Sequence, residues 1–166
     1  MITLRLATLN DIPAIQEVSE KTWPVSYKEI ITSEQIRYML DRMYSTSNIE
    51  QSILDPNQAF WLTEKDGKTI GFCGIEHHYP EARFTRIHKL YVLPDTQGMG
   101  AGKILLRHIE KEALLRGNTH LHLNVNKRNK AVDFYRKHGF SIACEEVLDI
   151  GNGFVMDDFV MTKTFE

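Results

Sequence analysis

The sequence predicts a mixed α/β fold in which helices flank one sheet. Most segments with the alternating apolar pattern of strands follow one another directly along the chain, while two segments with helical spacing interrupt the strands of the second half. This mixture favours a mixed sheet over a regular doubly wound one. The chain has 166 residues, enough to bury a full core, and we predict a single domain over residues 1–166.

The N-terminal part of the chain begins with a predicted strand and continues with helices. Apolar residues alternate over residues 2–6, and residues 8–11 have the pattern of a capping box. Helical spacing follows over residues 12–18 and returns over residues 36–43, in a region that Pro56 closes.

A hairpin and a further strand come next. Asp66 and Gly67 lie between two apolar strands, residues 60–62 and 69–72. An Asp-Gly pair in this position is a strong signal of a tight β-turn. The following strand is predicted over residues 87–93.

The second half alternates helices and strands. A helix begins after a glycine-rich turn and ends at Gly117, a strand covers residues 121–125, and a second helix covers residues 129–138. Two strands complete the chain, at residues 142–148 and 154–164.

Composition and charge are those of an ordinary soluble protein. Hydrophobic residues make up 42% of the chain and charged residues 25%. A formal net charge of -2 argues against nucleic acid as the main partner, because phosphate backbones select basic surfaces. The sequence shows neither a signal-peptide core nor an apolar run of the ~18 residues that span a membrane. We therefore expect a cytoplasmic protein that binds neither nucleic acid nor a membrane.

The cysteines and histidines do not predict a metal site. Cys73 and Cys144 lie in apolar stretches without the spacing of zinc ligands, so we expect two reduced core thiols. His120 and His122 alternate along one predicted strand, but no third ligand has a recognisable spacing.

The most informative segment is the glycine-rich turn between the strand at residues 87–93 and the next helix. Gly98, Gly100 and Gly102 leave the backbone N–H groups open to an oxygen-rich ligand, and the helix N-terminus adds further donors and a partial positive charge. The turn therefore predicts a site for a phosphate or pyrophosphate, although such a turn can also arise for tight geometry alone.

Two well-known phosphate loops do not fit this segment. A dinucleotide fingerprint needs a glycine where Lys103 stands. A P-loop needs Ser or Thr after Gly102-Lys103, where the sequence has Ile104, and a glycine where it has Gln97.

Gln97, Gly100 and Gly102 instead resemble the acetyl-coenzyme A signature of the GNAT family of N-acetyltransferases, Gln/Arg-x-x-Gly-x-Gly/Ala. Residues 124–140 resemble the second block of that family, which ends in Phe-Tyr-x-x-x-Gly-Phe. The resemblance implies a mixed, mostly antiparallel sheet that splays open between its fourth and fifth strands. It also implies acetyl-CoA as the cofactor, bound in the opening.

The resemblance assigns the cofactor site residue by residue. The backbone of Leu90, Tyr91 and Val92 would pair with the cofactor arm, and one of its N–H groups would polarise the thioester carbonyl. Asn129 would also hydrogen-bond the arm. The pyrophosphate would lie on the turn formed by Gln97, Gly98, Met99, Gly100, Ala101 and Gly102.

Tyr135 and His88 are the predicted catalytic residues. Tyr135 matches the family tyrosine that protonates the departing thiolate, a transfer uphill by roughly 2 kcal/mol, and the alternative is ring packing beside Phe134. His88 is the predicted base, since strand alternation would place it on the same face as Leu90 and its ordinary pKa near 6.5 suits proton removal. Many relatives carry a glutamate where this chain has Arg86, so an ordinary sheet residue remains the alternative for His88.

The acceptor is predicted to be a primary amine. The N-terminal half is similar to the polyamine acetyltransferases of the PaiA branch, which favours a small polyamine. No cysteine is placed as an acyl carrier, so we expect direct transfer. Trp23, Tyr27 and Glu76 are the predicted substrate-binding residues, since aromatic rings and carboxylates hold ammonium groups, and ordinary core packing is the alternative for Trp23 and Tyr27. Asp157 and Asp158 near the last strand form either a solvated turn or part of the acceptor wall. The alternatives are a protein N-terminus or lysine as acceptor, or a non-catalytic acyl-CoA sensor; a homodimer is left open.

Overall fold

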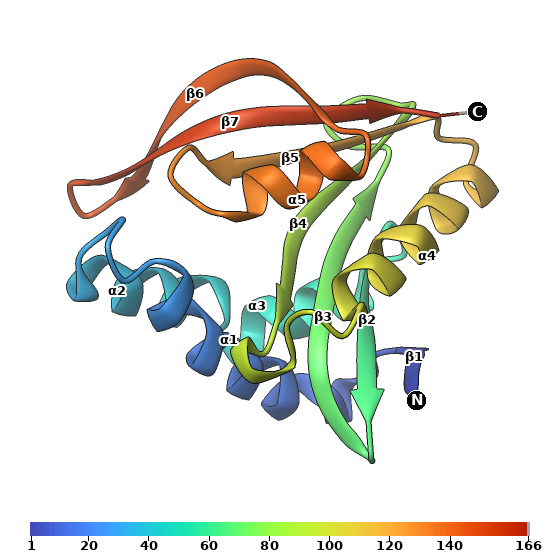
Figure 1. Ribbon diagram of the computed structural model, residues 1–166, viewed down its shortest axis with the longest axis horizontal. Helices are drawn as coiled ribbons and strands as arrows, with labels where there is room; N and C mark the ends of the chain where they lie inside the picture. The colour runs from blue at the N-terminus through green and yellow to red at the C-terminus, as the bar shows by residue number, and fades with distance from the viewer. Residues whose placement is uncertain (166) are drawn as a thin grey trace.

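The computed structural model describes residues 1–165, and its centre is a seven-stranded sheet (Figure 1). The strand order is β1-β2-β3-β4-β5-β7-β6. The strands are β1 (Ile2–Leu6), β2 (Gln58–Lys65), β3 (Lys68–His77), β4 (Phe84–Val92), β5 (His120–Asn126), β6 (Ser141–Gly151) and β7 (Phe154–Thr164). The helices are η1 (Leu9–Asp11), α1 (Ile12–Ser26), α2 (Ser33–Met43), α3 (Thr46–Leu54), η2 (Pro94–Thr96), α4 (Ala101–Leu115) and α5 (Ala131–Lys137).

The sheet opens between β4 and β5, as predicted. These two strands are the parallel pair of an otherwise antiparallel sheet, and they pair only over Phe84–Ile87 and His120–Leu123. Beyond that point β4 continues to Val92 and β5 to Asn126 without pairing with each other. We call the space between these unpaired ends, residues 88–92 and 124–126, the split.

The two faces of the sheet carry separate hydrophobic clusters. Helices α1, α2 and α3 cover one face and pack with residues such as Phe60 and Phe72. Helices α4 and α5 cover the other face and pack with residues such as Ile75, Ile87 and Leu123. Side chains alternate along each strand, so the strands contribute residues to both hydrophobic clusters. One face of the split therefore borders the cluster under α1, α2 and α3, and the other borders the cluster under α4 and α5.

The first helices reach across to the β6–β7 hairpin at the wide end of the split (Figure 1). The Gln35 amide donates to the Val155 carbonyl at 2.8 Å, and the Tyr38 hydroxyl donates to the Ile150 carbonyl at 3.0 Å. Arg128 adds a hydrogen bond to the carbonyl of Glu29 at 2.8 Å. These contacts fix the two walls of the split relative to each other.

Two local expectations are confirmed and one is wrong. Asp66 and Gly67 both have positive φ, of 51° and 76°, as the predicted tight hairpin turn requires. The helical region before Pro56 is two helices, because Ser45 begins α3 by accepting a hydrogen bond from the Asn48 N–H. Cys73 is buried as expected, but Cys144 is exposed on β6 and is not a core thiol. No helix within residues 1–165 is long and apolar enough to cross a membrane.

Candidate active site

A β-bulge at His88 shapes the wall of the split that β4 forms. Gly74 of β3 pairs with Lys89 and Ile75 pairs with Ile87, which leaves His88 without a partner on β3. The extra residue breaks the alternation of side chains. Ile87 and Leu90 therefore both pack on the α4 face, and the prediction that His88 shares a face with Leu90 is wrong.

Beyond the bulge, β4 presents backbone groups to the split. The Leu93 N–H donates to the Ile70 carbonyl of β3 at 2.8 Å. Because N–H groups alternate sides along a strand, those of Leu90 and Val92 point away from β3 and into the split. The Gln97 amide reaches the Val92 carbonyl at 3.4 Å from the same side. A bound chain can pair with β4 here as an added strand would.

The glycine turn is an unfilled cradle of backbone donors. Gly98 and Gly100 have φ of +88° and +89°, and no other atom lies within 4 Å of where a side chain would begin. Some backbone N–H groups at the start of α4 have no acceptor within residues 1–165, namely those of Gly98, Gly100, Ala101, Gly102 and Lys103. Together with the helix dipole they suit a doubly charged phosphate group, so the turn fits the pyrophosphate of coenzyme A.

Gly102 has a different role from the other two glycines. A Cβ atom at this position would lie 3.2 Å from the Phe134 ring of α5. Its lack of a side chain therefore lets α4 and α5 pack closely, instead of opening the backbone to a ligand. Met99 is exposed at the tip of the turn, and Ala101 is buried beneath it.

Tyr135 lies on α5 with its ring in the α4-side cluster. The ring is 6% exposed and packs against Phe134 and Phe140 at centroid distances of 5.4 Å. Its hydroxyl has no hydrogen-bond partner within residues 1–165, and it is close enough to Cys73 and Tyr27 for their charges to affect it. Burial raises the pKa of Tyr135 well above 10, so the phenol stays protonated and can only donate.

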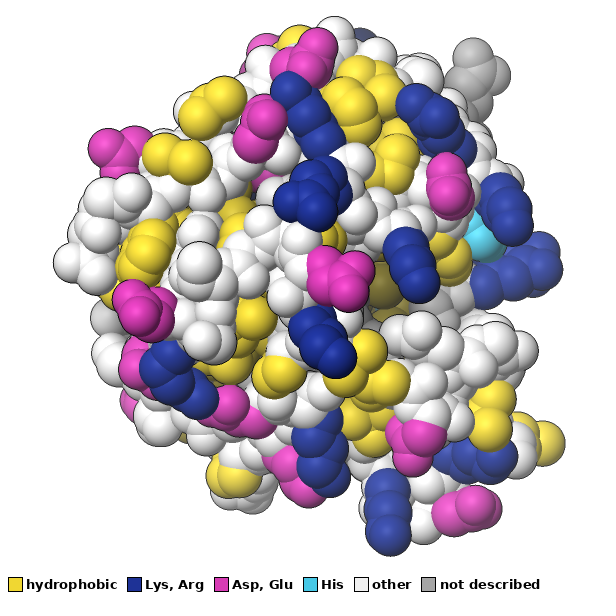
Figure 2. All heavy atoms as spheres, turned by 60° about the vertical axis from the view of Figure 1, so that its left-hand side comes forward, with side chains coloured by type: hydrophobic (Ala, Val, Ile, Leu, Met, Phe, Trp, Pro, Cys, Tyr) yellow, Lys and Arg dark blue, Asp and Glu magenta, His cyan; other side chains and the backbone are white. Residues whose placement is uncertain are grey.

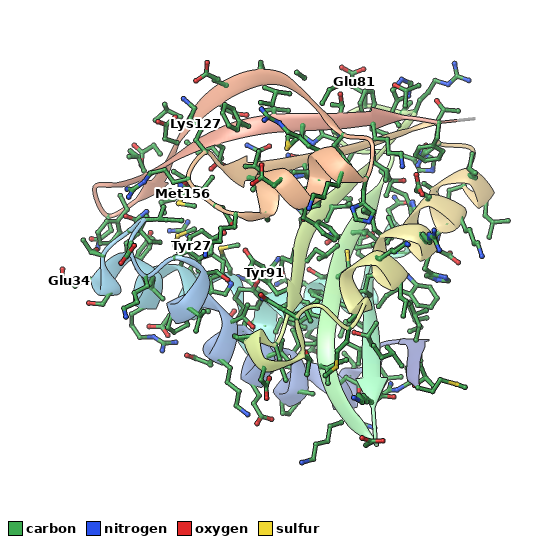
Figure 3. The ribbon with its side chains drawn as sticks, viewed as in Figure 1. Tyr27, Glu34, Glu81, Tyr91, Lys127 and Met156 are labelled. Carbon is green, nitrogen blue, oxygen red and sulfur yellow. The ribbon has the colours of Figure 1, made fainter. Side chains whose placement is uncertain are left out.

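Tyr27 at the end of α1 and Tyr91 of β4 lie side by side (Figure 3). Their hydroxyl oxygens are 3.1 Å apart. Burial raises the pKa of Tyr27, and the nearby Asn129 side chain opposes that shift in part. Asn129 also accepts a hydrogen bond from the Ala131 N–H at 2.9 Å. Trp23 is 1% exposed and stacks on Tyr27, so it is a core residue that cannot touch an acceptor without repacking.

His88 is the centre of a chain of polar side chains on the face opposite to Leu90. Its Nε2 lies 2.8 Å from the Glu76 carboxylate, and its Nδ1 accepts a hydrogen bond from Arg86 Nε at 3.2 Å. Burial and the cations Arg86 and Lys89 lower the pKa of His88 to about 3, while the Glu76 carboxylate opposes that shift. His88 is therefore neutral at pH 7, with both ring nitrogens engaged.

A groove of about 800 Å³ lies on this same face, between α2, α3, β2 and the tip of the β6–β7 hairpin. Lys89 forms part of its lining, with its ammonium group 5.6 Å from the centre of the Tyr44 ring. Burial lowers the pKa of Lys89 to about 8. Figure 2 brings the left-hand side of Figure 1 forward and shows basic and acidic side chains interspersed over that face, with hydrophobic ones between them. This face therefore carries no patch of a single sign of charge.

Sequence reasoning missed one residue of this face, Lys89, and left the role of a second, Asp158, open between a solvated turn and part of the acceptor wall. Asp158 of β7 is 5% exposed, and burial raises its pKa to about 6. Asn124 of β5 donates to it at 3.4 Å. No local motif marks either residue, because the bulge exposes Lys89 and strand pairing brings Asn124 and Asp158 together. An acidic residue inside a predicted strand was the available signal for Asp158.

Known proteins similar to this chain are N-acetyltransferases. The chain is 25% identical over 170 residues to a spermidine N(1)-acetyltransferase of Thermoplasma acidophilum, covering 99% of this chain and 98% of the relative. It is 33% identical to the peptidyl-lysine N-acetyltransferase YiaC of Escherichia coli, over 87 residues and 52% of each chain. The crystal structure of the PaiA N-acetyltransferase of Thermoplasma acidophilum in complex with coenzyme A superimposes with a TM-score of 0.86, at 25% identity and 99% coverage of both chains.

The family model of the acetyltransferase (GNAT) family matches residues 13–140, which include the β4 wall, the glycine turn and Tyr135. The sheet opens between β4 and β5, and the turn beside the opening has backbone N–H groups that have no acceptor among residues 1–165. The protein belongs to the GNAT family and is an acetyl-CoA-dependent N-acetyltransferase.

Proposed function

We propose that the protein transfers the acetyl group directly from acetyl-CoA to a primary amine of a small polyamine. The observation that carries the proposal is a set of carboxylates on the face of the sheet opposite to α4. Glu76, Glu146 and Asp158 have no Lys or Arg nitrogen within 4.0 Å, among residues 1–165. Polycations are the ligands that such unpaired carboxylates favour. Similarity to a spermidine acetyltransferase and to PaiA supports the same acceptor.

The cofactor would lie between β4 and α4. The N–H groups of Gly98 and of residues 100–103 would bind its pyrophosphate, and the backbone of Leu90 and Val92 would hold its arm. Acetyl-CoA supplies the activated acetyl thioester when it is bound. A backbone N–H of β4 would stabilise negative charge on the thioester oxygen, which is the role of an oxyanion hole.

Tyr135 is our candidate for the group that protonates the departing thiolate. It is the side chain of α5 with a free hydroxyl at the split, and burial keeps it in the protonated form that can donate. A positioned acid typically accelerates such a step by about 10²–10⁴-fold.

The acceptor must lose a proton before it attacks. An alkylamine with a pKa near 10.4 is neutral in only about one molecule in 2,500 at pH 7, a deficit of ~4.6 kcal/mol. We propose His88 as the residue that takes this proton at Nδ1, once the Arg86 guanidinium releases that nitrogen, and passes it to solvent water. Glu76 accepts from Nε2 and stabilises the imidazolium as it forms. Because its pKa is lowered, His88 is a weak base and holds the proton only transiently.

Direct transfer is consistent with the cysteines. Cys73 is fully buried, and burial raises the pKa of its thiol well above the ordinary value. Cys144 lies on the exposed surface of β6. Cys73 is therefore a poor carrier of an acetyl group, since the thiolate is the reactive form, and Cys144 on the outer surface is not among the residues of the split.

A panel of acceptors assayed by release of free coenzyme A tests the proposal. It should include spermidine, putrescine, aminoglycosides, free amino acids and lysine peptides. We expect spermidine or putrescine to give the highest kcat/KM. Efficient acetylation of peptides without any of the polyamines would show that the acceptor is a protein amine.

A further inference from the structure

Asp158 is a buried carboxylate with one oxygen that nothing in the protein satisfies. It is 5% exposed, its Oδ1 has no hydrogen-bond partner within residues 1–165, and its Oδ2 accepts only from the Asn124 amide at 3.4 Å. No Lys, Arg or His nitrogen of that part of the chain lies within 4.0 Å of the carboxylate. An unpaired buried charge is unfavourable, which is a reason to look for a ligand that completes it.

Asn124 presents a second unsatisfied oxygen beside it. The Asn124 amide N–H group donates to Glu146 at 3.3 Å and to Asp158, while its buried Oδ1 has no donor. Glu146 of β6 pairs directly with Asp158 in the β6–β7 register. We call these three side chains the ammonium recess (Asn124, Glu146, Asp158). The two oxygens of the recess without a hydrogen-bond partner, Oδ1 of Asn124 and Oδ1 of Asp158, are acceptors. An alkylammonium group offers three N–H donors and no acceptor.

The recess opens toward the split. Asn124 follows His122 by two residues on β5, and the His122 ring contacts Arg86 at 3.3 Å, so the recess shares a face with Arg86 and His88. The charge of Asp158 also raises the pKa of Tyr27, whose hydroxyl meets Tyr91 on the opposite wall. Asp158 therefore faces the same space as the β4 edge.

We propose that the ammonium recess binds a second, non-reacting ammonium group of the acceptor and so selects diamines and polyamines over monoamines. An amine that is paired with a carboxylate keeps its proton and is no nucleophile, so the recess suits the group that is not acetylated. Asp158 is ionised above pH 7, because its raised pKa is about 6. The inference rests on the proposed function and names the feature of the acceptor that this face recognises.

Two substrates with the same four-carbon chain provide the test. Putrescine carries a second ammonium group where n-butylamine carries only a hydrogen atom. We expect the wild-type protein to prefer putrescine in kcat/KM by at least about thirtyfold, the scale of one buried charge pair. In Asp158→Asn the preference should fall to about threefold or less, through a higher KM for putrescine, with n-butylamine hardly affected.

Asp157→Asn is the matched control. Asp157 is the exposed neighbour of Asp158, its side chain points to the other face, and it pairs with Lys127 at 2.9 Å. This variant should keep the wild-type preference. If Asp158→Asn also keeps the preference, the recess does not bind the second ammonium group and the inference is overturned, while the proposed function stands.

Binding measurements separate the inference from the proposed function. If the wild type acetylates neither amine, the polyamine assignment fails, and calorimetric titration of putrescine into the CoA-loaded protein decides the inference. Binding that Asp158→Asn loses supports it, and absent or equal binding overturns it. If Asp158→Asn does not fold, the wild type itself is titrated.

When the wild type is titrated because Asp158→Asn does not fold, putrescine should bind at least about fivefold more tightly at pH 7.5 than at pH 5. The Asp158 carboxyl ionises between these values, while the diamine stays fully charged. The charged or titratable groups near Asp158 are Glu146, Arg86 and Tyr27, and Asp157 beside it on the other face of β7. Glu146→Gln should weaken binding without removing the pH dependence. A flat pH profile in the wild type would overturn the inference.

Discussion

The glycine turn and the ammonium recess are built in opposite ways. The turn consists of consecutive residues, and it offers backbone N–H groups at the start of α4. The recess draws Asn124, Glu146 and Asp158 from three strands, and it offers side-chain oxygens. Backbone donors fix the cofactor end of the site whatever side chains surround it. The acceptor end depends on individual side chains, so it can change between relatives without disturbing the cofactor end.

This comparison predicts that changes at the cofactor end affect every acceptor alike, whereas changes at the recess affect charged acceptors selectively. For the kinetic variants, the question is whether activity falls with every acceptor or only with acceptors that carry a second charge.

The largest effect should come from Tyr135→Phe. If the hydroxyl protonates the thiolate, its loss should lower kcat by about ten- to a thousandfold for every acceptor, with the affinity for acetyl-CoA nearly unchanged. Steady-state kinetics with putrescine and n-butylamine would measure it. Wild-type turnover in Tyr135→Phe would reduce Tyr135 to a packing residue.

The next largest effect should come from Gly100→Val. The residue has φ of +89° and open space beside it, so a side chain both strains the backbone and fills the cradle. We expect acetyl-CoA to bind at least about tenfold more weakly, which corresponds to ~1.4 kcal/mol. Calorimetric titration would measure the affinity.

Gly117→Val is a control matched in backbone geometry. Gly117 has φ of +79° with nothing within 4 Å, and it lies at the far end of α4. Both variants should lose similar stability, but only Gly100→Val should lose affinity. Equal losses of affinity in the two variants would mean that the strain, not the cradle, is responsible.

The sequence predicts features whose residues are consecutive, like the glycine turn, better than features whose residues come from separate strands, like the ammonium recess. The strand order around the opening, the glycine turn and Tyr135 belong to motifs whose residues are close in the chain, and the predicted fold is confirmed. The bulge at His88 is invisible in sequence, because an inserted residue looks like any other strand residue until its partner on β3 is known. Asn124 and Asp158 are 34 residues apart and meet only through the β5–β7 register.

A third experiment compares two buried carboxylates, Asp11 and Asp158. Asp11 is 9% exposed and binds the Arg5 guanidinium at 2.7 Å, which lowers its pKa to about 2. Its stabilisation is full above pH 4 and is lost as the pH falls through 2. Asp158 has the opposite shift, so its carboxyl stabilises the folded state most when protonated. That contribution falls as the pH rises from about 4 to 6.

Replacement by Asn should therefore act with opposite signs. At pH 7, Asp11→Asn should lower the free energy of unfolding by about 1 kcal/mol, a value discounted because Arg5 is partly exposed. Asp158→Asn should raise it by on the order of 1 kcal/mol at pH 7 and leave it nearly unchanged at pH 4. Urea unfolding at the two pH values measures both. If Asp158→Asn is destabilising at pH 7, the carboxylate has a structural partner and is not held for a ligand.

The smallest effect should come from His88→Gln, which tests whether the bulge residue titrates during catalysis. Because burial, Arg86 and Lys89 lower the pKa of His88 to about 3, its charge does not change between pH 5 and 9. We expect kcat to fall by about three- to tenfold for putrescine and n-butylamine alike, since the relay is lost. The acidic limb of the kcat/KM profile should keep its position. A limb that disappears in the variant would show that His88 titrates near neutral pH, which requires Glu76 to outweigh the two cations beside the ring.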